Sequence, residues 1–241
     1  MNERRRTVLK ELGLTPLWRL RKPSAAAQSL QPETGSPETT ETEAFEQTGQ
    51  QTVEVEQMNW AQLTKTVSNC HACPLRQTCT QTVFGVGDYN ADWLYIGEGP
   101  GAREDALGEP FVGQAGKLLD NMLAAIHLKR GHNVYITNIV KCRPPNNRNP
   151  NIEEALQCTP YLTRQIALIK PKLIIALGKV AAQNLLNCND SIASMRGKIH
   201  SYSGIPLIVT YHPAYLLRAL PEKAKAWKDL CTARELMQSL K

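Results

Sequence analysis

From Trp60 onward, short apolar runs alternate with longer amphipathic stretches. Four runs of aliphatic and β-branched residues predict buried strands, at 92–96, 133–140, 172–177 and 206–210. Apolar residues at helical spacing predict helices over 114–130, from a cap at Asn149 to about 170, over 179–186 and over 222–240. Strands separated by helices favour right-handed crossovers, so we expect an α/β domain whose mainly parallel, four-stranded sheet is covered on both faces.

In such a sheet, the functional site lies where the carboxyl ends of the parallel strands meet. The segments that leave those ends are 97–111, 138–150, the stretch from Gly178 onward, and 212–218. We therefore expect the chemistry of this protein to reside in these loops.

The first 59 residues do not share this pattern, and their charge divides them in two. Residues 1–22 hold seven Lys and Arg against two Glu, with apolar residues at helical spacing. We interpret them as a short basic helical segment that docks onto its own domain or onto a protein partner. Residues 23–59 carry no charged residue type except Glu and have little to bury, so they predict a flexible acidic linker before a domain over 60–241.

Composition narrows the class of protein. A chain of 241 residues that is 42% hydrophobic can build a sizeable core, and it has no run of about 20 apolar residues that would cross a membrane. Charges interrupt the N-terminal region where a secretion signal would be apolar. Seven cysteines without such a signal favour a reducing, cytoplasmic location, where clustered thiols are more often metal ligands than disulfides.

Four cysteines have a spacing that suits a metal centre. Cys70 and Cys73 form a C-x-x-C pair before the first strand. Cys142 leaves the second strand, and Cys158 lies about two turns into the next helix. A zinc ribbon usually has a second C-x-x-C pair, so the irregular spacing favours an iron–sulfur cluster over zinc.

The other cysteines have plainer interpretations. Buried free cysteine is common in proteins, and we expect Cys188 and Cys231 to be of this kind. Cys79 stays a rival ligand because it is close in sequence to the C-x-x-C pair.

The segment GEGPGA at 97–102 matches the G-x-G-x-x-A pattern of a dinucleotide site. Two features speak against that use. Residues 103–110 are acidic and interrupted by Gly and Pro, which predicts a poor helix start, and the second strand is followed by Lys141-Cys142-Arg143 instead of a ribose-binding carboxylate. The alternative is a tight turn whose backbone N–H groups can approach a ligand closely.

Three motifs together resemble the iron–sulfur branch, type 4, of the uracil-DNA glycosylase superfamily. They are GEGPGAREDALGEPFVGQAGKLLD (97–120), TNIVKCRPP (137–145) and YHPAYLLR (211–218), set within the frame of the four spaced cysteines. The resemblance covers about residues 60–241. It implies a three-layer α/β/α fold, excision of uracil from DNA to leave an abasic site, and a [4Fe–4S] cluster on Cys70, Cys73, Cys142 and Cys158.

The resemblance also implies roles that suit the side chains concerned. The base must be flipped out of DNA into a pocket, where Phe111 would stack on it. The carboxamide of Asn138 matches N3–H and O4 of uracil and mismatches cytosine. His212, neutral or protonated, would donate a hydrogen bond to uracil O2 and stabilise the departing anion.

The glycine-rich loop would complete this pocket. The backbone of Gly97, Glu98 and Gly99 would contact the edge of the base. Glu98 stands where other branches carry a water-activating Asp or Asn, so general-base catalysis is an open point. Glu98 or Asp105 would orient water or favour the cationic sugar, and Glu104 would crowd out the methyl group of thymine. We favour a dissociative path in which the water needs little activation.

We expect the DNA-binding surface of the protein to lie around the same strand ends. The expected substrate is single- or double-stranded DNA that contains uracil. Leu216 and Leu217 would wedge into the space that the flipped base vacates, unless one of them belongs to the core. The cluster would pin the loop of Arg143 to the domain. Phosphate contacts are expected from the nearby cations, which are Lys141, Arg143, Arg148, Arg196, Lys198 and Arg218.

Two other classes of function are alternatives to this monomeric glycosylase. A nucleotide-dependent oxidoreductase would hold NAD or flavin in the glycine-rich loop and would show the spectrum of that cofactor. A non-catalytic iron–sulfur module would bind nucleic acid and release no base. One branch of the superfamily captures the abasic sugar covalently through a histidine in an inserted basic loop, which residues 196–200 (RGKIH) resemble superficially.

Overall fold

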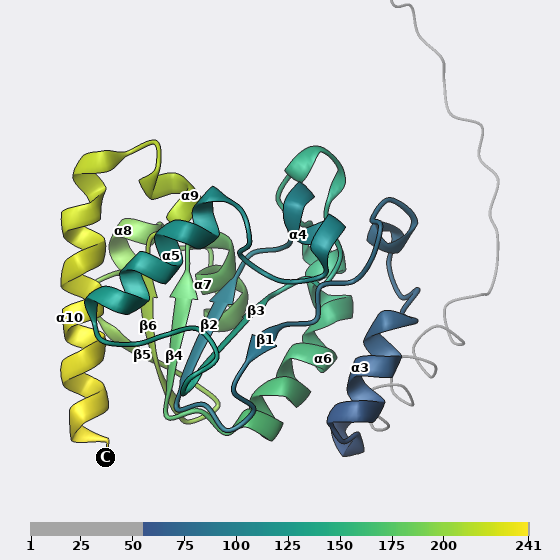
Figure 1. Ribbon diagram of the computed structural model, residues 1–241, viewed down its shortest axis with the longest axis horizontal. Helices are drawn as coiled ribbons and strands as arrows, with labels where there is room; N and C mark the ends of the chain where they lie inside the picture. The colour runs from purple at the N-terminus through teal and green to yellow at the C-terminus, as the bar shows by residue number, and fades with distance from the viewer. Residues whose placement is uncertain (1–54, 241) are drawn as a thin grey trace, which may run out of the picture. The chain divides into compact units, whose positions relative to one another are not determined.

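The computed structural model describes residues 55–240, whose elements are shown in Figure 1. The predicted basic segment 1–22 and most of the predicted linker lie outside the described residues. Residues 55–59, which the sequence assigned to the linker, pack onto the domain. Val55 is buried against Leu63 and Val67 of helix α3 (Trp60–Ser68), and Arg164 Nε donates a 2.6 Å hydrogen bond to the carbonyl of Met58.

A six-stranded sheet forms the centre of the domain, in the order β1-β3-β2-β4-β6-β5. The four central strands are parallel and are the four that the sequence predicted: β2 (Trp93–Gly97), β3 (Val134–Asn138), β4 (Leu173–Leu177) and β6 (Ile205–Thr210). Two short antiparallel strands flank them, β1 (Val86–Gly87) and β5 (Ile199–Tyr202). Neither edge strand has an apolar run, because neither is fully buried.

Helices cover both faces of the sheet, as Figure 1 shows. One core joins the sheet to α5 (Gln114–Ala125), α9 (Pro213–Leu216) and α10 (Lys223–Ser239). The other joins it to α6 (Ile152–Ile169), α7 (Lys179–Leu186) and α8 (Ile192–Met195). Alternation along β2 decides the faces, since Trp93 and Tyr95 point into the first core whereas Leu94 and Ile96 point into the second. The fold is therefore the expected three-layer α/β/α arrangement.

Two local predictions about helix starts were wrong. Helix α6 is capped by Asn151 and not by Asn149, because Asn151 and Glu154 exchange side-chain and backbone hydrogen bonds in a capping box. The segment after the glycine-rich loop does form a helix, α4 (Ala102–Leu107), which ends at Gly108 with φ of 77°. The glycine stops this helix after six residues, as left-handed glycines do.

Three single turns of 3₁₀-helix complete the described fold: η1 (Pro74–Gln77), η2 (Pro145–Asn147) and η3 (Leu220–Glu222). Within residues 55–240, none of the helices combines the length and the apolar character needed to cross a membrane.

Candidate active site

A cleft of about 640 Å³ opens where the carboxyl ends of the central strands meet. Each strand contributes to its lining: Glu98 follows β2, Asn138 ends β3, Gly178 follows β4 and His212 follows β6. Phe111 lines the same cleft. The parallel register brings together side chains that are far apart in the sequence, as the topology predicted.

Asn138 presents an unused acceptor in this cleft. Its Oδ1 atom is buried and has no hydrogen-bond partner in the described structure. Gly97 makes room for it, because a Cβ atom at this position would overlap Asn138 Oδ1 and lie 2.6 Å from the ring of Phe111. A buried acceptor without a partner is costly, so this atom is suited to a ligand that donates a hydrogen bond.

Phe111 is held in an unusual backbone conformation, with φ of 56°. Arg130 donates hydrogen bonds of 2.8 Å to the carbonyl oxygens of both Pro110 and Phe111 and pairs with Asp120 at 3.0 Å. Gly116 allows α5 to approach, since a Cβ atom there would overlap the Phe111 carbonyl. Sequence reasoning missed Arg130, because no pattern in the chain links it to Phe111.

His212 lies against Phe111 and caps the N-terminus of α9. Burial, reinforced by the nearby Arg218 and opposed by Glu104, lowers the pKa of His212 to about 4, so the imidazole is neutral near pH 7. Its Nδ1 atom accepts a 3.2 Å hydrogen bond from the backbone N–H of Ala214. The proton of the neutral ring is thus assigned to Nε2, which can act as a donor.

The carboxylates of the glycine-rich loop differ in their surroundings. Glu98 lines the cleft, and burial raises the pKa of its carboxyl group. Glu104 Oε1 accepts 3.0 Å hydrogen bonds from the backbone N–H groups of Val112 and Gly113, so it fixes the loop that carries Phe111.

Asp105 does not fit the role expected of it. It is buried away from the lining of the cleft, and its carboxylate accepts hydrogen bonds from the N–H and hydroxyl of Thr80 and from Gln81 N–H. The proposal that Asp105 orients water was therefore wrong, since its oxygens are already occupied.

The two leucines after His212 have different environments. Leu216 is 1% exposed and packs in the core between α5 and α10, so it cannot wedge into DNA. Leu217 is 42% exposed. Arg218 lines the cleft, and Arg143 donates a 2.8 Å hydrogen bond to Asn147, which also lines it. Lys198 is exposed just before β5, outside the lining of the cleft.

Two cations were wrongly expected to contact phosphates. Lys141 is 1% exposed. Arg196 is engaged by Asp229, at 2.8 Å, and its guanidinium lies 4.3 Å from the centre of the Tyr211 ring. A third, Arg148, lines the cleft but also forms a 2.6 Å ion pair with Glu154.

A second, smaller pocket is lined by the four predicted metal ligands. Cys70, Cys73, Cys142 and Cys158 face it together with Lys141 and Tyr161. Burial raises the pKa of Cys158 to about 11 and also raises the pKa values of Cys73 and Cys142. Buried thiols of this kind become thiolates only beside positive charge, which a metal supplies.

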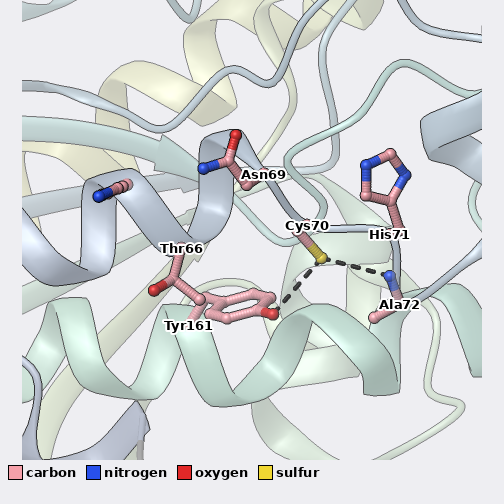
Figure 2. Close-up of a pocket in the computed structure, with 7 residues that line it drawn as sticks. Thr66, Asn69, Cys70, His71, Ala72 and Tyr161 are labelled. Atoms are coloured by element: carbon pink, nitrogen blue, oxygen red, sulfur yellow. Dashed lines mark hydrogen bonds between the residues drawn. The ribbon is translucent and has the colours of Figure 1, made fainter.

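Cys70 is half-buried and lies where this thiol pocket meets a second, more open pocket. Figure 2 shows Tyr161 Oη and the backbone N–H of Ala72 pointing at its sulfur, at 3.4 and 3.5 Å. The same side faces an open pocket of about 540 Å³ that His71 also lines. Both the Tyr161 hydroxyl and the Ala72 N–H therefore donate a hydrogen bond to the Cys70 sulfur.

The thiols form a lining and not a compact single-ion site. Within the described residues, no three His, Cys, Asp or Glu side chains are arranged to hold one metal ion. Burial is the main cause of the raised pKa of Cys142, and the neighbouring Cys79 raises it further. Cys79 itself does not line the pocket. Cys188 and Cys231 lie elsewhere and are half-buried.

Comparisons with known proteins agree with this fold. Residues 84–231 match the family model described as the uracil DNA glycosylase superfamily, and the chain belongs to that superfamily. Relatives that are more than 40% identical include several type-4 uracil-DNA glycosylases. The protein of Archaeoglobus fulgidus is 45% identical over 64% of this chain and 81% of its own length. That of Pyrobaculum aerophilum is 42% identical over 72% and 92%, and that of Thermotoga maritima 45% over 63% and 80%. The chain is thus a member of the type-4 branch.

Proposed function

We propose that this chain is a DNA-repair glycosylase that flips uracil out of DNA and hydrolyses its N-glycosidic bond, leaving an abasic site. One observation carries the proposal above the others. The buried, unpartnered acceptor of Asn138 shares a cleft with the ring of Phe111 and the imidazole of His212. Uracil N3–H can donate a hydrogen bond to this acceptor, and the flat uracil ring can stack on Phe111.

The cleft discriminates by hydrogen bonding. Asn138 Oδ1 accepts from uracil N3–H and the amide nitrogen donates to O4, whereas cytosine offers a bare N3 and an amino group. A wrong base leaves buried polar groups unpaired, which costs far more than a poor apolar fit. Gly97 permits this arrangement because any side chain there would fill the space beside the carboxamide.

His212 stabilises the charge that develops as the bond breaks. The bond between uracil N1 and the sugar carbon C1′ breaks with both electrons going to the base, which leaves a cationic sugar. A neutral His212 donates from Nε2 to uracil O2, where the negative charge gathers. Water then adds to C1′ as one of its protons passes to solvent, the uracil anion takes up a proton from solvent, and neutral uracil is released. Glu98 lines the cleft but is not an obligatory base in this path.

DNA binding uses the rim of the cleft. Leu217 is the exposed apolar side chain that fills the space left by the flipped base. Arg143, Lys198 and Arg218 contact phosphates on either side, so binding weakens with salt. A monomer in a reducing compartment is sufficient for this chemistry.

Cys70, Cys73, Cys142 and Cys158 hold a [4Fe–4S] cluster in this proposal. Four cysteines around one pocket match the donor set of such a cluster. When bound, the cluster would supply positive charge that stabilises the thiolates. It would also cross-link three parts of the chain: the loop before η1, the segment after β3, and α6. Because Cys142 lies between Lys141 and Arg143, its attachment to the cluster would keep this segment ordered beside the cleft.

The test is to incubate the protein with single- and double-stranded oligonucleotides that contain one uracil. Free uracil and alkali-labile sites are expected in both cases, and none with thymine or cytosine at the same position. Binding without release of uracil would indicate the non-catalytic module instead. A purified sample that carries NAD or flavin and releases no base would favour the oxidoreductase.

A further inference from the structure

Lys141 is buried beside the thiol pocket and contacts the backbone of Asn138, which lines the cleft. Its side chain is 1% exposed and lines the thiol pocket together with Cys142 and Cys158. Burial of a lysine is expensive unless its amine is fully hydrogen-bonded. Its contacts therefore indicate what the structure gains from it.

The amine of Lys141 has three short contacts. Its Nζ atom donates to Thr137 Oγ1 at 2.7 Å, to the backbone carbonyl of Asn138 at 2.8 Å and to Gln165 Oε1 at 2.7 Å. Three acceptors use all three hydrogens of an ammonium group. The amine thus connects the end of β3 to helix α6, which lie next to each other in Figure 1.

The acceptors are themselves fixed. Thr137 Oγ1 donates to the carbonyl of Phe84 at 2.9 Å, and Gln165 Nε2 donates to the same carbonyl at 3.0 Å. Gln165 and Thr137 are fully buried. Because its partners cannot move freely, Lys141 holds the Asn138 carbonyl in one orientation.

The orientation of that carbonyl matters for Asn138. β3 ends at this residue, where its side chain enters the cleft, and the following N–H of Ile139 still donates a 2.9 Å hydrogen bond to the carbonyl of Gly97. The bond from Lys141 holds the other side of this same peptide group. Fixing its carbonyl limits rotation of the peptide group and keeps Oδ1 beside Gly97. A displacement of about 1 Å in a binding group can lower a rate by about 10²-fold.

We propose that Lys141 is a positioning residue for base recognition, which aims the Asn138 carboxamide through its bond to the Asn138 backbone. Lys141 also connects the two pockets. It bonds to Gln165 of α6, the helix that carries Cys158 of the thiol pocket, and to Asn138, which lines the cleft. This inference rests on the proposed glycosylase function.

The experiment compares wild type with Lys141→Met, which keeps the length and apolar stem but removes the donors. The readouts are inhibition by free uracil, binding of DNA with an abasic-site analogue, and visible absorption of the metal centre. We expect free uracil to inhibit about 10- to 100-fold more weakly, while abasic DNA binding and absorption stay close to wild type. Equal inhibition by uracil, with abasic DNA binding and absorption retained, would overturn the proposal.

Gln165→Met and Thr137→Val serve as second variants, because each removes one anchor of Lys141 and keeps its bond to Asn138 available. If Lys141→Met does not fold, these variants are expected to weaken uracil inhibition several-fold without changing abasic DNA binding. Unchanged uracil inhibition in both would refute the role of Lys141. A wild-type protein that releases no uracil would instead refute the proposed function, so the two failures can be told apart.

Discussion

The imidazole of His212 lies beside the ring of Phe111, with 5.5 Å between ring centroids and 30° between the planes. The two residues are about a hundred positions apart in the sequence, and the parallel ends of β2 and β6 bring them together. A flat base that stacks on Phe111 would place one edge within reach of His212. The two residues thus offer a stacking face and a hydrogen-bond donor to the same base.

Replacing His212 by Ala should reduce uracil excision by about 10²- to 10³-fold, because it removes the donor to the developing anion. Glu98→Gln should retain near-full turnover, since the proposed path needs little activation of water. Single-turnover rates with saturating enzyme measure both effects. The reverse ranking, with Glu98→Gln the more damaged variant, would favour general-base catalysis by Glu98.

The pH dependence of excision should reflect the low pKa of His212. The neutral imidazole is the proposed active form, so the rate should not depend on this group between pH 6 and 8 and should fall as the pH drops through about 4. Measuring single-turnover rates in the Glu98→Gln background removes the contribution of the Glu98 carboxyl group. A rate that rises on acidification towards pH 5 would indicate that the protonated imidazole is the active form.

Arg130→Gln should weaken substrate binding more than it slows the chemical step. Loss of the two hydrogen bonds to the carbonyls of Pro110 and Phe111 releases a backbone held at positive φ. We expect KM to rise about tenfold with a smaller change in kcat, because stacking on Phe111 stabilises the bound base and the transition state alike. The control is Lys129→Gln, which removes a neighbouring exposed charge. Equal effects of the two substitutions would show that charge alone matters.

Leu217→Ala should affect double-stranded DNA selectively. Single-stranded DNA needs no side chain to replace a flipped base in a stack, so its excision rate should change little. On double-stranded DNA we expect a loss of about tenfold, comparable to a stacking contact. Leu220→Ala, another exposed leucine at 61% exposure, is the matched control. A similar loss on both substrates would remove the wedge role from Leu217.

Cys142→Ser should lower the content of iron and inorganic sulfide, the visible absorption and the melting temperature together, because binding of a metal centre contributes to folding. Cys231→Ser, far from the thiol pocket, should leave all of these unchanged. Cys79→Ser distinguishes the rival ligand: we expect iron content near that of wild type. Loss of iron in Cys79→Ser but not in Cys158→Ser would reassign the fourth ligand.

Much of the fold was predictable because it follows from local patterns. The four central strands are nearly continuous apolar runs, and such runs are what a sheet buried on both faces requires. The edge strands β1 and β5 were missed because half-exposed residues leave no such run. Capping by Asn151 instead of Asn149 could not be decided in advance, since both precede the same amphipathic stretch.

The candidate site was predictable in its residue types and not in their surroundings. Motifs identified Phe111, Asn138 and His212, but burial separated Leu216 from Leu217. Asp105 and Lys141 illustrate the same limit. Nothing in the sequence reveals that the Asp105 carboxylate accepts a hydrogen bond from Thr80, or that the Lys141 amine donates one to the carbonyl of Asn138.

The sequence by itself determined the order of strands and helices, the frame of spaced cysteines and the chemical groups available at the strand ends. Periodicity and motif spacing are local properties of the sequence, so they do not depend on contacts between distant segments. Only the tertiary structure decided which of those groups are free: it neutralises His212 by burial, leaves Asn138 Oδ1 without a partner, and encloses Lys141. Burial and hydrogen-bond partners depend on contacts between distant segments, and for that reason they appear only once the sheet has assembled.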